Sequence, residues 1–294
     1  MDSKKLKEAK YYKKIEEKKV VCNVCYRNCV IENNKFGFCG TRKNIEGTLY
    51  TLVYGKPVAI NIDPIEKKPI FNYLPHTKTL SFGTLGCNFD CMFCQNYDIS
   101  KATETNIYLN KQFIEPQEII ELAKKYNCPS ISYTYTEPTI FVEYALDIMK
   151  LAKKNNLKNI WVSNGYMQKK VLNDICKYLD AINVDLKGNQ QFYDKLINGI
   201  NVEKIKENIE LFYKKGIHIE ITNLLIEGYN TDKKQIQEII EFIANIDKKI
   251  PLHFTRSFGA YKLTNIQPTK PETIEMAREM AIKKGLKYVY IGNI

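Results

Sequence analysis

The chain has 294 residues, of which 44% are hydrophobic and 26% are charged, a composition typical of a globular protein with one large α/β domain or two smaller ones. No window approaches the roughly 20 apolar residues of a membrane span, and the charged N-terminus lacks the apolar core of a secretory signal, so we expect a cytoplasmic protein without a membrane partner. The net charge of +11 comes mainly from lysine, since only four of the 44 basic residues are arginine, and it therefore predicts a solvated surface and not a nucleic-acid site.

The N-terminal region, residues 1–76, contains a predicted helix, a cysteine cluster and a β-rich lead-in. Residues 1–19 place apolar side chains at helical spacing, which predicts a basic amphipathic helix. The stretch that begins at Gly47 alternates short extended runs with prolines, which predicts strands and not a flexible linker. We expect this region to be distinct from a second domain over residues 77–294.

Four cysteines in the N-terminal region follow the spacing C-x2-C-x3-C-x9-C. In a reducing compartment, clustered cysteines more often bind metal than form disulfides. Four thiolates complete a closed tetrahedral site for zinc or for an auxiliary iron–sulfur cluster, and the ligand set leaves the metal open. The predicted ligands of this second metal site are Cys22, Cys25, Cys29 and Cys39.

From residue 77 onward, predicted strands alternate with predicted helices. This alternation implies parallel βα units with right-handed crossovers. About six such units predict an α/β fold of the partial or full (β/α) barrel type, and the first strand is not followed by a GxGxxG dinucleotide motif. The expected strands are 78–86, 129–135, 158–165, 181–188, 218–226, 251–257 and 287–293, and the expected helices are 115–126, 139–155, 168–179, two within 190–215, 232–246 and 270–285.

Each expected barrel strand except the terminal one ends in polar residues. In β/α barrels the carboxyl ends of the strands meet at one mouth, where the chemistry takes place. We therefore expect these residues to form a single site. The candidates are Cys87, Cys91, Phe93 and Cys94 after the first strand, and Glu137, Ser163, Asn164, Asp185, Lys187, Asn223, His253 and Arg256 after the later ones.

The cysteines at 87, 91 and 94 have the spacing C-x3-C-x2-C. Three cysteines can hold three irons of a [4Fe-4S] cluster and leave the fourth iron without a protein ligand. Two alternatives are a zinc knuckle that lacks one ligand and plain core thiols. The polar residues at the other strand ends favour the open cluster, because an incomplete site needs groups that bring a ligand to it.

The cysteine loop after the first barrel strand resembles that of the radical S-adenosylmethionine (SAM) superfamily, over most of residues 78–258. Several further segments, together with the upstream cysteines, are similar to AmmeMemoRadiSam-type proteins, which are relatives of the pyruvate formate-lyase activating enzymes. These segments are "DPIEKKPIF", "YTEPTIF", "VSNGY", "NVDLKG", "LHFTR" and "YVYIGN".

The resemblance implies an enzyme that cleaves SAM on the cluster to a 5′-deoxyadenosyl radical, which abstracts hydrogen from a substrate. It also implies a reductant such as ferredoxin or flavodoxin, and it makes a protein one candidate substrate. In "YTEP", Glu137 stands where such families place the acid that binds the methionine ammonium, although Tyr135 and Thr136 replace paired glycines. Asp185 and Lys187 match an Asp-x-Lys pair near the ribose and carboxylate of SAM. Expected SAM neighbours include Phe93, Ser163, Asn164, Asn223, His253 and Arg256.

Two other functions remain open at this point. An iron–sulfur electron-transfer or scaffold protein would explain the cysteines but not Glu137, Asp185 and Lys187. An RNA-modifying radical SAM enzyme would use the basic surface. Family resemblance does not carry the substrate, so the substrate itself is not predicted.

Overall fold

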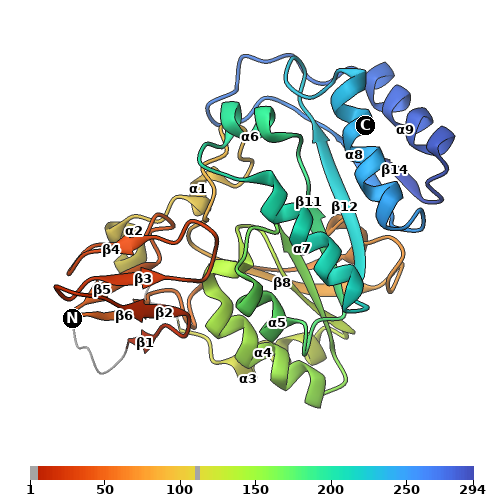
Figure 1. Ribbon diagram of the computed structural model, residues 1–294. Coiled ribbons are helices and arrows are strands. Elements are labelled where there is room, and N and C mark those ends of the chain that lie inside the picture. Colours follow the sequence, from red (N-terminus) through yellow and green to blue (C-terminus); the bar gives the residue numbers. More distant parts are fainter. Residues whose placement is uncertain (1–5, 110–112) are drawn as a thin grey trace.

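The computed structural model describes residues 6–109 and 113–294 (Figure 1). Its centre is an eight-stranded sheet in the order β14-β13-β12-β11-β10-β9-β8-β7. Strands β8 to β14 are parallel to their neighbours, and β7 runs antiparallel to β8. The strands are β7 (Pro57–Pro64), β8 (Lys78–Thr84), β9 (Ser130–Tyr133), β10 (Lys158–Ser163), β11 (Ala181–Asp185), β12 (His218–Leu225), β13 (Leu252–Arg256) and β14 (Val289–Gly292).

Helices cover the outer face of this sheet, as Figure 1 shows. The order of strands has two ends, β14 and β7, so the barrel is partial. The predicted fold class is confirmed, with six βα units followed by a terminal strand. The helices are α1 (Tyr97–Ser100), α2 (Glu104–Leu109), α3 (Pro116–Lys125), the 3-10 helix η3 (Pro138–Phe141), α4 (Val142–Lys154), α5 (Lys169–Ile175), α6 (Gln190–Leu196), α7 (Val202–Lys214), α8 (Lys233–Ile246) and α9 (Pro271–Lys284).

Local sequence explains where the helices begin and which face they bury. The α3 helix starts at Pro116, and Glu115 and Glu118 form a reciprocal capping box at its N-terminus. Asp232 caps α8 by accepting a hydrogen bond from the Gln235 amide. The strands beneath are buried on both faces, as parallel strands covered by helices are. None of the described helices combines the length and apolarity that a bilayer crossing requires.

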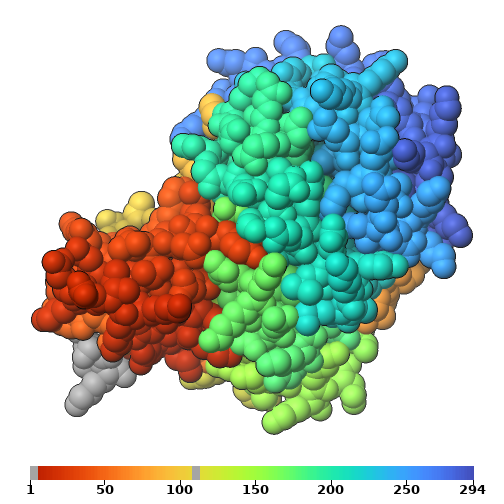
Figure 2. Space-filling model, in the orientation of Figure 1, coloured from red at the N-terminus to blue at the C-terminus, as the bar shows by residue number. Residues whose placement is uncertain are grey.

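The N-terminal module, residues 6–51, is built from short strands and protrudes from one side of the barrel (Figure 2). Its two three-stranded sheets have the orders β1-β6-β5 and β2-β3-β4. The strands are β1 (Lys7–Glu8), β2 (Tyr12–Lys14), β3 (Val20–Cys22), β4 (Val30–Ile31), β5 (Arg42–Ile45) and β6 (Thr48–Thr51).

The helix predicted for residues 1–19 is wrong where the structure describes that segment. Strand β1 pairs with β6, and β2 pairs with β3. Ala9 and Tyr11 are buried while Lys10 between them is exposed, which is the alternation of an extended chain. Pairing with strands that lie up to about 40 residues further along the chain overrides the helical spacing, and no local pattern reveals such partners. Residues 1–5 of this prediction lie outside the described residues.

The lead-in predicted before residue 77 does contain a strand, but that strand belongs to the barrel sheet. Strand β7 pairs with β8 along its whole length, from Pro57 opposite Thr84 to Pro64 opposite Lys78. The short 3-10 helix η2 (Ile65–Lys67) follows, and the segment after it packs against the open side of the sheet through Phe71, whose ring lies 4.7 Å from that of Tyr290 on β14.

A buried ion pair joins the N-terminal module to the barrel. The Arg42 guanidinium on β5 donates to both carboxylate oxygens of Glu143 on α4, at 3.0 and 2.7 Å, and to the Ile140 carbonyl at 3.1 Å. Both side chains are almost fully buried, at 1% and 4% exposure. Replacing only one partner of such a pair strongly destabilises the fold, because the remaining charge stays buried without compensation.

We therefore expect Arg42→Met to lower the free energy of unfolding by about 3–5 kcal/mol. The double variant Arg42→Met/Glu143→Met should recover part of this loss, since neither charge is then left alone. Chemical denaturation of the unmodified protein, of Arg42→Met, of Glu143→Met and of the double variant measures both effects. A double variant that is destabilised by the sum of the two single changes would contradict the coupling.

Candidate functional site

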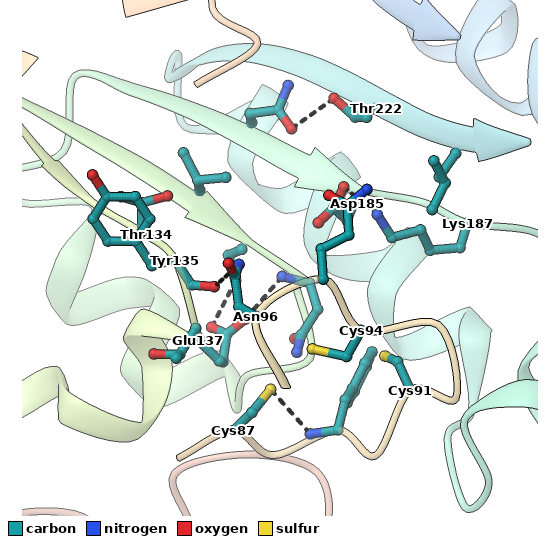
Figure 3. A pocket seen from close by; sticks show the side chains of 18 of the residues that line it. Cys87, Cys91, Cys94, Asn96, Thr134, Tyr135, Glu137, Asp185, Lys187 and Thr222 are labelled. Atoms are coloured by element: carbon teal, nitrogen blue, oxygen red, sulfur yellow. Dashed lines mark hydrogen bonds and ion pairs between the residues drawn. The ribbon is translucent and has the colours of Figure 1, made fainter. Parts of the chain in front are cut away.

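A cavity of about 610 Å³ lies at the carboxyl ends of the barrel strands. In Figure 3 the three cysteines lie at one end of this cavity and Thr222 at the other, with Asp185 and Lys187 between them. Its volume falls in the range of roughly 300–1,000 Å³ that ligand sites occupy. The predicted site residues that line it are Cys87, Cys91, Phe93, Cys94, Glu137, Ser163, Asn164, Asp185 and Lys187.

The cysteine loop leaves β8 through a turn that requires glycine. Gly86 has a φ of +91°, and a Cβ at this position would lie 2.6 Å from the Cys39 carbonyl of the N-terminal module. The Gly86 amide also donates to the Ile99 carbonyl at 2.9 Å. This close approach holds the start of the loop against the N-terminal module and thereby positions Cys87.

Burial acts on the thiols of Cys87 and Cys91 in this loop. Burial raises the pKa of the Cys87 thiol well above its usual value, and the Glu137 carboxylate adds to the effect. Burial, with Cys94 as the next cause, raises the pKa of Cys91 to about 12. Thiolates at this site therefore need a cationic partner, such as the irons of a cluster.

Cys87, Cys91 and Cys94 lie together at one end of the cavity. In a cubane held by three cysteines, each cysteine binds a different iron. The residues at this end of the cavity thus fit a [4Fe-4S] cluster, by the chemistry of three soft thiolate donors around a common space.

Glu137 is buried, at 1% exposure, and accepts several hydrogen bonds. Its Oε1 accepts from the Thr139 amide at 3.0 Å, from the Thr139 hydroxyl at 2.5 Å and from the Ser163 hydroxyl at 2.8 Å, and its Oε2 accepts from the Asn164 amide at 2.9 Å. Burial raises its pKa above the usual value, and these bonds oppose the rise. Glu137 caps η3, and its Oε2, with a single bond, retains capacity toward the cavity.

Asp185 and Lys187 form an ion pair on the cavity wall, with Nζ 2.6 Å from Oδ1. The two side chains are partly exposed, at 31% and 16%. The Lys187 amide lies 3.2 Å from the Tyr193 hydroxyl, which holds the end of β11 in place. The pair offers one acceptor and one donor side by side to a ligand that carries a hydroxyl or a carboxylate.

Ser163 and Asn164 connect the parts of this wall. Besides the bonds to Glu137, the Asn164 side-chain amide donates to the Asn88 side chain at 2.7 Å, and Asn88 follows Cys87 in the cysteine loop. Phe93 lies beside Cys94 with its ring centroid 5.8 Å from that of Phe192. These contacts fix the cysteine loop relative to strands β9 and β10.

Three residues that we expected near SAM are not among the described residues that line the cavity, namely Asn223, His253 and Arg256. The Asn223 side chain donates to the Leu186 carbonyl at 2.7 Å, and Arg256 Nε donates to the Thr269 carbonyl at 2.6 Å. His253 Nε2 lies 2.6 Å from Glu220 Oε2, and its ring stacks on Tyr290. Each of these side chains has a hydrogen-bond partner within the fold.

The four N-terminal cysteines are close enough to affect one another. Burial raises the pKa of Cys22 to about 11, the Arg42 guanidinium opposes the rise, and Cys39 and Cys29 add to it. Arg42 Nε is buried and has no hydrogen-bond partner among the residues that the structure describes. An unsatisfied donor beside thiols is costly unless an acceptor, such as a metal-bound thiolate, is present.

The N-terminal module also touches the cysteine loop of the barrel. Arg27, between Cys25 and Cys29 in the sequence, donates from Nε to the Asn88 carbonyl at 2.5 Å. On the other side of Cys87, Gly86 lies against the Cys39 carbonyl, so the module contacts the loop on both sides of Cys87. A further contact joins the module to the start of α5, where the Gln168 amide donates to the Val24 carbonyl at 3.0 Å.

Several cavity residues were not predicted from the sequence. They come from loops that only the fold brings to the mouth, or from the opposite side of the strands. The segment "DPIEKKPIF" contributed to the family resemblance, but no role was assigned to its lysines. The unpredicted residues that line the cavity include Lys67, Lys68, Pro69, Gln95, Asn96, Ser100, Tyr135 and Asn183, whereas Thr134, Thr136, Thr222 and Thr255 are among the polar residues expected at the strand ends.

Comparisons with known proteins agree with this geometry. The family model of the Radical SAM superfamily matches residues 82–243. An uncharacterized protein of Methanocaldococcus jannaschii is 44% identical over 290 residues, which are 98% of this chain and 86% of that protein. The pyruvate formate-lyase 1-activating enzyme of Escherichia coli K12 is 20% identical over 223 residues, 70% of this chain and 89% of that enzyme. The structure of Streptococcus suis SuiB bound to S-adenosylmethionine shares the fold, with a TM-score of 0.54 at 15% identity over 73% of this chain and 51% of that chain.

Proposed function

The chain belongs to the radical SAM superfamily, and from this premise we propose that it cleaves SAM reductively in the cavity at the barrel mouth. The observation that carries the proposal is that three free cysteines line the same cavity as Glu137 and the Asp185–Lys187 pair. When bound, the [4Fe-4S] cluster supplies the electron that divides SAM into methionine and a 5′-deoxyadenosyl radical, which abstracts hydrogen from the substrate.

The residues around the cavity have separate roles in this proposal. Cys87, Cys91 and Cys94 hold three irons and leave the fourth open to SAM. Glu137 Oε2 accepts a hydrogen bond from the SAM ammonium, at a buried position where a charge-assisted bond is strong. Asp185 accepts from the ribose hydroxyls, and Lys187 binds the SAM carboxylate.

Other residues position these groups and exclude water. Ser163 and Asn164 hold the Glu137 carboxylate, and Phe93 covers one side of the cluster position. Similarity to an activating enzyme supports a protein substrate and a reductant such as ferredoxin or flavodoxin as candidate partners.

The test is anaerobic incubation of the reconstituted protein with SAM and dithionite, followed by chromatography. We expect 5′-deoxyadenosine and methionine in equal amounts. A protein that binds iron and sulfide but forms no 5′-deoxyadenosine would contradict the proposal and would favour an electron-transfer protein.

For the N-terminal cysteines we propose a second [4Fe-4S] cluster. Burial raises the pKa values of Cys22 and Cys25, and the other cysteines of the group add to the rise, so the four thiols lie close together. The unpaired Nε of Arg42 supports an anionic centre at this position. Arg42 would donate to a metal-bound thiolate, while its other nitrogens remain on Glu143.

We expect about eight irons per chain in the reconstituted protein and about four in the Cys29→Ala variant, since only the N-terminal cluster is lost. Elemental analysis with sulfide determination measures this difference. Cys176→Ala, a change at a cysteine outside both clusters, serves as the control and should keep all eight. About four irons with one zinc in the unmodified protein would contradict the second cluster.

A further inference from the structure

One lysine lies buried in the cavity wall at a place that the proposed SAM contacts do not use. Lys68 follows η2, and its side chain is only 3% exposed. It lines the cavity together with Pro69, Asn183 and Thr222. We call these four residues the far wall, because Figure 3 shows Thr222 at the end of the cavity opposite the cysteines.

The contacts of Pro69 join the members of the far wall to one another. The Asn183 side-chain amide donates to the Pro69 carbonyl at 2.7 Å, and the Thr222 hydroxyl donates to the Asn183 side-chain oxygen at 2.9 Å. Pro69, Asn183 and Thr222 carry no charge. Lys68 is therefore the charged member of the far wall.

The charge of Lys68 is shared with one carboxylate that has other partners. Asp63 Oδ2 accepts from Lys68 Nζ at 2.6 Å and from the Tyr135 hydroxyl at 2.7 Å, and its Oδ1 accepts from Lys67 Nζ at 3.0 Å. Burial would raise the pKa of Asp63, but the hydrogen bonds from Lys68, Tyr135 and Lys67 hold it well below its usual value. One carboxylate thus faces two ammonium groups, and the set carries a net charge of +1.

The two lysines are not equivalent. Lys67 is 67% exposed and therefore screened by water. Lys68 is buried, with its Nζ 4.5 Å from the centroid of the Tyr135 ring. Burial lowers the pKa of Lys68, and Asp63 opposes this effect. An ammonium has three N–H donors, of which Asp63 takes one, so Lys68 retains donors for a ligand in the cavity.

The acids that line the cavity do not satisfy this charge. Glu137 is bonded to Thr139, Ser163 and Asn164. Asp185 is paired with Lys187 at 2.6 Å. Lys68 lines the cavity, and the Asp63 carboxylate that it contacts is shared with Lys67 and the Tyr135 hydroxyl, so its remaining N–H groups can donate to a ligand with one negative charge.

We propose that Lys68 binds a carboxylate of the substrate at the far wall. The inference rests on the proposed function, since it assumes that the substrate shares the cavity with SAM. A single compact ammonium, without an arginine fork, matches one monoanion better than a doubly charged phosphate. The carboxylate belongs either to a small acid or to an acidic side chain or C-terminus of a protein, both of which present the same group to Lys68.

The experiment uses acetate as the probe, acetamide as its uncharged counterpart, and saturation-transfer NMR on the reconstituted protein at constant ionic strength. We expect the unmodified protein to bind acetate and not acetamide. Lys68→Met should weaken acetate binding at least tenfold, and Lys67→Met, the matched change at the exposed lysine, should leave it within about twofold. If Lys68→Met does not fold, the double variant Asp63→Asn/Lys68→Met removes both charges together and should show the same loss.

Three results would overturn the proposal. They are an unmodified protein that does not bind acetate, a folded Lys68 variant that binds acetate as the unmodified protein does, and displacement of acetate by SAM, which would assign Lys68 to SAM. With unlabelled glutamate and with a short peptide that ends in a free carboxylate as competitors, displacement by one of them identifies which source fits. Acetate binding is measured without a reductant, so its failure is distinct from a failure to form 5′-deoxyadenosine.

Discussion

Replacing Cys91 with alanine should remove about four irons per chain and reduce 5′-deoxyadenosine formation to the level of the protein-free reaction. The cluster has only three protein ligands, and the two thiols that remain after the change cannot hold it. Cys91 lies at the mouth of the barrel and is not part of the sheet, so the fold should persist. Iron analysis, product chromatography and circular dichroism measure the three quantities.

The matched control is again Cys176→Ala, which removes a thiol that lies at the end of α5. It should keep both the iron and the activity. A Cys91 variant that still forms 5′-deoxyadenosine at more than a tenth of the original rate would show that the three cysteines do not hold the catalytic cluster.

Replacing Glu137 with glutamine should weaken SAM binding by roughly 10- to 100-fold, which corresponds to the 1.5–3 kcal/mol of a hydrogen bond to a charged group. The change keeps the shape of the side chain but removes the negative charge that faces the SAM ammonium. Calorimetry of SAM binding to the reconstituted protein, without a reductant, gives the two dissociation constants.

A control is needed because Glu137 is also held by hydrogen bonds within the fold. Thr139→Val removes the hydroxyl that donates to Glu137 Oε1 at 2.5 Å, while the carboxylate and the capping bond from the Thr139 amide remain. If a disturbed hydrogen-bond network around Glu137 explains the loss, this variant should lose as much SAM affinity as Glu137→Gln does. If the charge matters, as we expect, the affinity of Thr139→Val should stay within a few-fold of the original value.

The barrel could be predicted from the sequence because its signals are local. Helices such as α8 carry an apolar stripe and a capping residue, Asp232, within their own segment. Each parallel strand is an apolar run that ends in polar residues. The rule that such ends meet at one mouth then placed Glu137, Asp185 and Lys187 with the cysteines, and the structure brings these residues to one cavity.

The N-terminal module could not be predicted in the same way, because its strands depend on distant partners. Lys7 on β1 pairs with Thr51 on β6, and Glu8 pairs with Tyr50. The segment has the composition of a helix. Its residues are nevertheless extended because they pair with strands of two sheets, and Ala9 and Tyr11 are buried as a result.

Distant partners also explain the residues of the site that were misjudged or missed. His253 is held by Glu220, which lies 33 residues earlier in the chain. Lys68 reaches the cavity because the segment after η2 packs across the open side of the barrel, where Pro69 meets Asn183. Such contacts follow from the tertiary fold, and a single sequence without its fold does not display them.

The central claim is that an iron at the three-cysteine site has an open position for SAM. Electron paramagnetic resonance of the dithionite-reduced Cys29→Ala variant, which isolates that site, tests this most directly. We predict a cluster signal whose g-values shift when SAM is added. A cluster signal that is identical with and without saturating SAM would contradict the account.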